Sequence, residues 1–302
     1  IWILDEDKAP SHAKIGDFIK DELSTSLDDI FNDINRYMFG KLGVDLNHAY
    51  IDGTKIEANA NKYTWVWKKS CIKSRNNVFG KLSALLEDIN AYMALYQSAV
   101  FEVRQEYAVE YVEYILGTFL NAAGMTVEDF VHGKGKHKTA IQRLYEKVYD
   151  CYKKLKSYAQ KIEICGEDRN SYSKTDNDAT FMRFKKDHMK NDQLLPGYNL
   201  QMVVCDEFIA HYGVYAYASD TDCFQPLMEG FHKRYGFYPQ YPVADAGYGS
   251  YNNYLYCEQH GMEKYMKFTM YEKETKESKY RDNPYRACNF AIDHEGYMVC
   301  PN

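Results

Sequence analysis

Acidic residues are missing from one long stretch of this sequence. Between Glu57 and Glu87 the chain contains neither Asp nor Glu, although its 302 residues carry a formal net charge of −6 at pH 7. The overall acidity argues at first against a nucleic-acid partner, because proteins that bind nucleic acid usually carry a basic excess. The local gap in acidity nevertheless leaves room for a basic surface, since it holds Lys62, Lys68, Lys69, Lys73, Arg75 and Lys81.

Long apolar runs and a secretory leader are also absent, so we expect no membrane partner. The eight cysteines show no paired framework, which predicts free thiols in a reducing, cytoplasmic compartment. Cys288 and Cys300 would also fit half of a zinc site, although single cysteines at this spacing favour a purely structural role. The chain starts without Met in I-W-I-L-D and stops at C-P-N, so we expect a fragment of a longer protein.

Two more basic stretches follow the first. One runs from Lys134 to Lys161, and the other, R-F-K-K-D-H-M-K, spans 183–190. Local basic faces on an acidic chain are compatible with phosphate binding. For the stretch 134–161 alone, the pattern favours a solvated helix face.

The periodicity of apolar residues predicts helices at both sides of a strand-forming segment. Residues 11–40 have helical spacing, with Ser11 as one cap and a second helix opening at Ser26. The next segment, H-A-Y-I-D-G-T-K-I-E-A, alternates between apolar and polar residues as a strand does. Two long amphipathic stripes between 76 and 164 predict an antiparallel helical hairpin. Between the two stripes, the helix is broken by Gly117, Gly124, a capping box at Thr126 and a glycine-lysine turn. From Tyr198 onward the order is strand, strand, helix, strand, helix, strand, which predicts an α/β domain interrupted after its first strand.

Two of these strands end alike, in apolar residues followed by Asp and then a small residue. The segments are I-D-G-T at Asp52 and V-A-D-A-G-Y-G at Asp245. Ligands gather where the strands of α/β sheets end, and glycine there lets a backbone approach an ion or phosphate. Two adjacent carboxylates repel unless a cation lies between them, and Mg²⁺ prefers oxygen ligands with open positions for substrate phosphates. The alternative is that each Asp only caps its own turn.

Several linked motifs resemble the transposases of bacterial insertion sequences that carry a DDE catalytic domain. They are I-D-G-T-K-I-E-A-N-A-N-K-Y-T-W-V-W-K-K-S, S-K-T-D-N-D-A-T-F-M-R-F-K, L-P-G-Y-N-L-Q and P-V-A-D-A-G-Y-G-S-Y-N-N-Y, in the family's order. The resemblance implies a ribonuclease H-like mixed sheet with a large helical-hairpin insertion after the first strand. It also implies Mg²⁺ (or Mn²⁺), cleavage and strand transfer, double-stranded transposon-end and target DNA as partners, a homodimer on DNA, and a cytoplasmic, nucleoid-associated protein.

The resemblance also divides the chain. Residues 1–47 are then the helical tail of an N-terminal DNA-binding region, 48–75 the first strands of the catalytic domain and 76–165 the helical insertion. Residues 166–270 complete the ribonuclease H-like domain, and 271–302 begin a further insertion. Asp52 and Asp245 match the family's two catalytic, metal-binding aspartates. The third member, a Glu in a Y-x-x-R-x-x-x-E motif, has no match, since Glu258 and Glu263 precede its place, and we expect it beyond Asn302.

The residues around the first motif suggest a path for DNA, because aromatic rings stack on bases while cations neutralise phosphates. For one of Trp65 and Trp67, burial in the core is the alternative. The predicted DNA-binding residues are Lys55, Lys62, Trp65, Lys68, Lys69, Lys73, Arg75, Tyr248 and Asn252. Two other functions stay open: a non-catalytic DNA-binding or assembly fragment of a decayed transposase, and a nuclease of the same fold.

Overall fold

The structure, a computed structural model, describes residues 10–184 and 193–302 and divides into two compact units. The first unit comprises residues 1–54, 199–215 and 219–302, and the second comprises 55–198 and 216–218. Within the described residues, no helix is both long and apolar enough to cross a membrane. Most of the basic stretch at 183–190 lies outside the described residues.

The first unit begins with one continuous helical run. It consists of α1 (His12–Asp17), the π-helical turn η1 (Phe18–Leu23) and α2 (Ser24–Leu42). Ser11 caps α1 as predicted, since its side chain accepts a hydrogen bond from the Lys14 N–H. The predicted start of a new helix at Ser26 is wrong, because the π-helical turn carries the helix on without a break. Asn35 and Phe39 are the buried residues of α2.

A mixed sheet forms the centre of the first unit. Its strands are β1 (His48–Glu57), β5 (Leu194–Cys205), β6 (Phe208–Tyr215), β7 (Tyr241–Ala244) and β8 (Tyr265–Met266), together with β4 (Thr180–Arg183). Strand β4 belongs to the second unit, and β1 and β5 also contribute residues to that unit. β6 is antiparallel to β5, whereas β7 is parallel to β1 and β8 is parallel to β7. This mixed α/β arrangement agrees with the predicted fold class and is compatible with a ribonuclease H-like domain.

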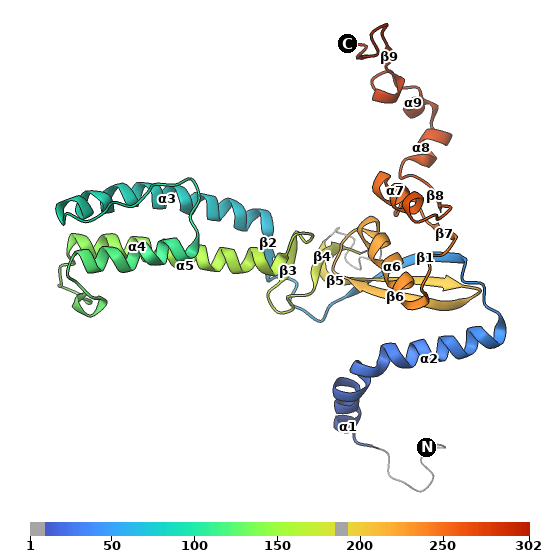
Figure 1. The fold of residues 1–302 in the computed structure, drawn as a ribbon, viewed down its shortest axis with the longest axis horizontal. Coiled ribbons are helices and arrows are strands. Elements are labelled where there is room, and N and C mark those ends of the chain that lie inside the picture. The colour runs from blue at the N-terminus through green and yellow to red at the C-terminus, as the bar shows by residue number, and fades with distance from the viewer. Residues whose placement is uncertain (1–9, 185–192) are drawn as a thin grey trace. The chain divides into compact units, whose positions relative to one another are not determined.

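Helices α6 (Asp220–Tyr235) and α7 (Tyr251–Gln259) follow β6 and β7 along the chain, as the periodicity predicts. α6 ends at Gly236, whose φ of 82° is left-handed, and α7 begins at the cap Ser250. Alternate strand residues such as Ile51 and Val203 pack with Phe224, Leu227 and other side chains of α6 into one core. Figure 1 shows α6 lying along β5 and β6.

The second unit contains three helices around their own apolar core: α3 (Lys68–Leu95), α4 (Val109–Ala122) and α5 (Ala140–Cys165). α3 and α5 lie side by side, and α4 packs against α5 (Figure 1). The predicted break at Gly117 is wrong, because this glycine lies inside α4, with open space at its Cα. The capping box at Thr126 is confirmed, although the helix it starts is a single 3₁₀ turn, η2 (Val127–Asp129).

A small two-stranded sheet in the second unit was not predicted. β2 (Trp65–Trp67) pairs antiparallel with β3 (Ser171–Ser173), and β4 (Thr180–Arg183) pairs with the first residues of β5. Trp65 is 46% exposed, while Trp67 is half-buried, and the rings of both lie near Phe181. Of these two tryptophans, Trp67 is therefore the one that is more buried.

The last residues of the first unit form short elements only. They are α8 (Tyr271–Lys276), α9 (Ser278–Arg281), the 3₁₀ turn η3 (Ala287–Asn289) and a hairpin of β9 (Ala291–Ile292) with β10 (Met298–Val299). No residue of these elements from α8 to η3 is buried. This segment adds no core to the sheet.

Candidate active site

The register of two parallel strands brings Asp52 and Asp245 together. β1 and β7 pair from His48↔Tyr241 to Ile51↔Ala244, and each aspartate is the next residue along its own strand. Neighbouring strands lie about 4.8 Å apart, so the two backbones are adjacent where the carboxylates project. Residues nearly two hundred positions apart in the sequence thus share one site.

The structure corrects the expectation that a strand ends at Asp52. β1 continues to Glu57, so Asp52 lies within the strand and only the pairing with β7 ends beside it. The strand continues because its other edge pairs with β5. Asp52 is also exposed, on the face of β1 opposite the buried Ile51, and therefore carries no cost of a buried charge.

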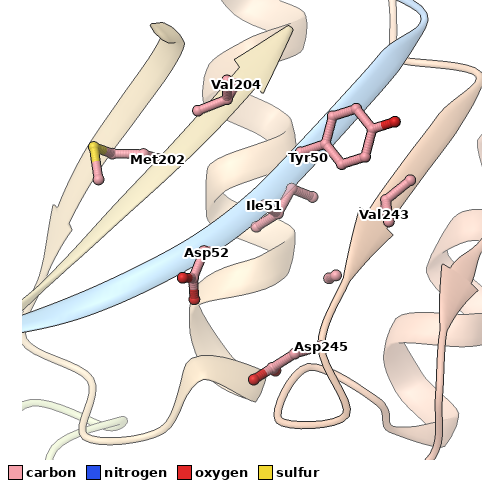
Figure 2. Close-up of a pocket in the computed structure, with 8 residues that line it drawn as sticks. Tyr50, Ile51, Asp52, Met202, Val204, Val243 and Asp245 are labelled. Atoms are coloured by element: carbon pink, nitrogen blue, oxygen red, sulfur yellow. The ribbon is translucent and has the colours of Figure 1, made fainter. Parts of the chain in front are cut away.

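Both carboxylates face a shared cavity of about 270 Å³. Apolar side chains of three strands form its wall, and the lining residues are Tyr50, Ile51, Asp52, Met202, Val204, Val243, Ala244 and Asp245. Figure 2 shows the carboxylates of Asp52 and Asp245 directed toward the same space at the ends of the paired segments. The arrangement concentrates negative charge at one end of an otherwise apolar cavity.

Each carboxylate uses one oxygen in a hydrogen bond to a nearby backbone N–H. Oδ1 of Asp52 accepts a hydrogen bond from the Gly53 N–H at 2.8 Å, and Oδ1 of Asp245 accepts one from the Gly247 N–H at 2.7 Å. Among the residues that the structure describes, none donates to the second oxygen of either group. The turn-capping alternative is therefore correct for one oxygen of Asp245, whereas Oδ1 of Asp52 bonds the next N–H within the strand. The other oxygen of each aspartate stays available to a ligand.

The sequence suggested that Gly53 leaves open space for an ion or a phosphate, but the structure shows no such space. A Cβ at this position would lie 2.1 Å from Nε2 of Gln201, so the glutamine amide occupies that space. Gln201 is fully buried on β5, on the same side of the sheet as Gly53. The requirement for glycine is thus internal packing.

Tyr248 lies beneath the site and is only 1% exposed. Its hydroxyl donates to Oε1 of Gln201, so the predicted contact with DNA is not available in this conformation. Burial and the charges of Asp220, Asp52 and Asp245 raise the pKa of Tyr248, which keeps the hydroxyl protonated as a donor. Asn252, by contrast, is exposed on the first turn of α7.

The neighbour of Asn252, Asn253, holds the site's supporting elements together. Its side chain is 2% exposed and donates to the carbonyls of Thr221 at 2.9 Å and Tyr248 at 2.8 Å. The hydroxyl of Thr221 in turn donates to the carbonyl of Gly247 at 2.7 Å. Asn253 therefore joins the start of α6, the turn that carries Asp245 and the start of α7.

We expect Asn253→Ala to lower the free energy of unfolding by about 2–4 kcal/mol, because it removes the donor to one buried and one partly buried carbonyl. Urea denaturation followed by circular dichroism measures the change. Asn252→Ala is the matched control, since it removes the adjacent, exposed amide and should change stability by less than about 0.5 kcal/mol. Equal effects of the two substitutions would contradict the role of Asn253.

The predicted DNA-binding cations of the second unit are in different environments. Lys69 and Lys73 are exposed at the start of α3, and Lys62 lies over the ring of Tyr63. Lys68 instead donates to the carbonyls of Gly166 and Glu167, where it caps the end of α5. The remaining two also have intramolecular partners: Lys55 donates to the carbonyl of Arg183, and Arg75 stacks on Phe79.

Within residues 10–184 and 193–302, no group of three or more His, Cys, Asp or Glu side chains could hold a metal ion. Asp52 and Asp245 therefore form no such group with a third carboxylate among the described residues. Glu258 forms an ion pair with Lys264 and does not line the cavity. All eight cysteines are free, and six of them are buried, whereas Cys288 and Cys300 are exposed.

Residues 169–295 match the family model of the transposase DDE domain. Asp245 lies inside the matched residues, and Asp52 precedes them. Comparisons with curated proteins and with solved structures found no match. The family agrees with the motifs that first indicated it, and residues 169–295 of this chain are therefore similar to the transposase DDE domain.

Proposed function

We propose that this chain is the catalytic core of a DDE-type DNA transposase, with Asp52 and Asp245 as two of its catalytic carboxylates. The observation that carries the proposal is the adjacent pair itself: two carboxylates at equivalent positions on parallel strands, facing one cavity. In the reaction, water cleaves a phosphodiester at a transposon end and leaves a DNA 3′-hydroxyl. This hydroxyl then attacks a phosphodiester of target DNA, so that a new phosphodiester forms and a 3′-hydroxyl of the target strand is released.

The residues present fit a divalent cation, which transposases of this family generally use. Mg²⁺ is commonly held by one or two carboxylates together with waters and substrate phosphates. Asp52 and Asp245 each have one oxygen that no described residue occupies, and both are exposed to incoming ligands. When bound, such an ion activates the attacking hydroxyl and neutralises charge on the phosphate.

The same proposal includes a contact between DNA and the second unit. The exposed ring of Trp65 is available to stack on an unpaired base, and Lys62, Lys69 and Lys73 supply positive charge in the same segment. Lys68 is left out of this contact because its ammonium group already binds two carbonyls at the end of α5.

Titration with Mn²⁺ tests the site without requiring the DNA sequence that the protein recognises. We expect the wild-type chain to bind Mn²⁺ and either Asp52→Asn or Asp245→Asn to weaken binding by about 10-fold or more, because each removes one of two anionic ligands. Isothermal titration calorimetry measures the affinity. Asp222→Asn is the control: Asp222 is an exposed carboxylate on α6 that does not line the cavity.

Equal Mn²⁺ affinity in all three variants would contradict the proposed site. If the chain binds DNA while its Mn²⁺ binding does not depend on Asp52 and Asp245, the result would instead support a non-catalytic DNA-binding protein.

A further inference from the structure

A buried polar network lies directly behind the two aspartates, on the covered face of the sheet. Its members are Asn199, Gln201, Asp220 and Tyr248, and the first two are fully buried on β5. Polar side chains at such positions are costly unless their hydrogen bonds are satisfied. Here every polar atom of the Gln201 amide has a partner.

The network fixes the orientation of the Gln201 amide. Its Nε2 donates to Oδ1 of Asn199 at 2.8 Å and to Oδ1 of Asp220 at 3.1 Å, while its Oε1 accepts from the Tyr248 hydroxyl. Asn199 also donates to Oδ1 of Asp220, at 2.8 Å. An ionised carboxylate only accepts hydrogen bonds, so Asp220 requires both amides to present their NH₂ groups to it.

The oriented amide contacts both chain segments that carry the catalytic pair. On one side, Gln201 lies where a side chain on Gly53 would be, directly after Asp52. On the other side, it accepts the hydroxyl of Tyr248, whose backbone N–H donates to the carbonyl of Asp245 at 3.3 Å. Gln201 therefore links the segment of Asp52 to the segment of Asp245, with Tyr248 as the intermediate on the second side.

We infer that Gln201 is a positioning residue that sets the separation of Asp52 and Asp245, and that Asp220 holds its amide in the required orientation. This role rests on the proposed function of the two aspartates. It assigns a purpose to an acidic residue that the family motifs quoted above do not include.

The geometry distinguishes this role of Asp220 from that of a third metal ligand. Oδ1 of Asp220 is already shared by two amide donors. A Cβ added at Gly247 would lie 3.7 Å from Oδ2 of Asp220 and 2.9 Å from Oδ1 of Asp245. The carboxylates of Asp220 and Asp245 are therefore neighbours across the turn. Within the described residues, however, Asp220 does not form a metal-binding group of three with them.

Comparison of Asp220→Ala with Asp220→Asn tests the inference. Asp220→Asn removes the negative charge but keeps an oxygen that accepts hydrogen bonds from Gln201 and Asn199, whereas Asp220→Ala removes both. Calorimetric titration with Mn²⁺ gives the readout. We expect Asp220→Ala to weaken Mn²⁺ binding by about 10-fold or more, as loss of a supporting partner does in other metal sites. Asp220→Asn should stay within about 3-fold of the wild type, and Asp222→Ala, on the same helical turn, should change nothing.

If Asp220→Ala does not fold, Tyr248→Phe tests the same network, since it removes only the hydroxyl that holds Oε1 of Gln201. We expect it to weaken Mn²⁺ binding by about 10-fold as well. Equal losses in Asp220→Asn and Asp220→Ala would show that the charge itself is needed and would overturn the positioning role. Normal binding in Asp220→Ala and in Tyr248→Phe, with binding still lost in Asp52→Asn, would overturn this inference alone. Binding that survives Asp52→Asn would overturn the proposed function first.

Discussion

Replacing either Asp52 or Asp245 with Asn is expected to reduce Mg²⁺-dependent cleavage of transposon-end DNA by about 10³-fold or more, equivalent to about 4 kcal/mol of transition-state stabilisation. Asn keeps the shape of Asp and removes its charge. The two carboxylates face one cavity from adjacent strands, so loss of either leaves a single anionic ligand for the cation.

The measurement is a strand-cleavage assay with the complete protein and duplexes that carry the ends of the element encoding it. Asp222→Asn serves as the control for loss of a carboxylate, since Asp222 is exposed on α6 and lies outside the cavity lining. DNA binding, measured by mobility shift, should persist in both site variants because they remove negative charge. Intact cleavage by either variant would refute the assignment, and hydrolysis without joining to target DNA would favour a nuclease of the same fold.

The second large effect is a loss of stability, expected on substitution of Gly53. Gly53→Ala should lower the free energy of unfolding by about 3 kcal/mol, because its methyl group would lie 2.1 Å from Nε2 of Gln201. The amide cannot move aside freely, since Asn199, Asp220 and Tyr248 hold it. Displacing it leaves buried donors and acceptors unpaired, at about 1–3 kcal/mol each.

Gly40→Ala is the matched control in the same unit. Gly40 lies within α2 with open space around its Cα, so an added methyl group should stabilise the helix by about 0.5–1 kcal/mol. Urea denaturation of the two variants gives the comparison. A Gly53→Ala protein as stable as the wild type would mean that the Gln201 amide tolerates displacement.

The order of strands and helices in the first unit could be predicted from local patterns. Helix α6 ends at Gly236 as predicted, and Ser11 caps the first helix. Several linked motifs, rather than periodicity, indicated that the segment around Asp245 resembles a transposase DDE domain. Such features depend on residues close in the sequence, which is why the sequence alone predicts them well.

Other features depend on contacts between distant residues and were missed. The β2–β3 sheet joins segments separated by about a hundred positions, and neither three-residue strand is long enough to show alternation. The apolar residues Leu27, Ile30 and Ile34 have helical spacing and yet are exposed, while Asn35 is buried because its amide donates to carbonyls of β6.

The Gln201 network also escaped prediction, although β5 contains a signal for it. Asn199 and Gln201 alternate in step with the buried Val203 and Cys205, which places two amides on the inward face of a strand. Polar residues in that register require partners, but nothing near them in the sequence shows that the partners are Asp220 and Tyr248.

The pairing of β1 with β7 has a consequence for how such a chain can vary. Four consecutive residue pairs, from His48↔Tyr241 to Ile51↔Ala244, determine where the two aspartates meet. This main-chain alignment is local and does not depend on how many residues connect the two strands. Insertions, deletions or exchange of the helices between residues 68 and 165 should therefore preserve the carboxylate pair, whereas a shift of β7 by a single residue would turn Asp245 to the opposite face of the sheet.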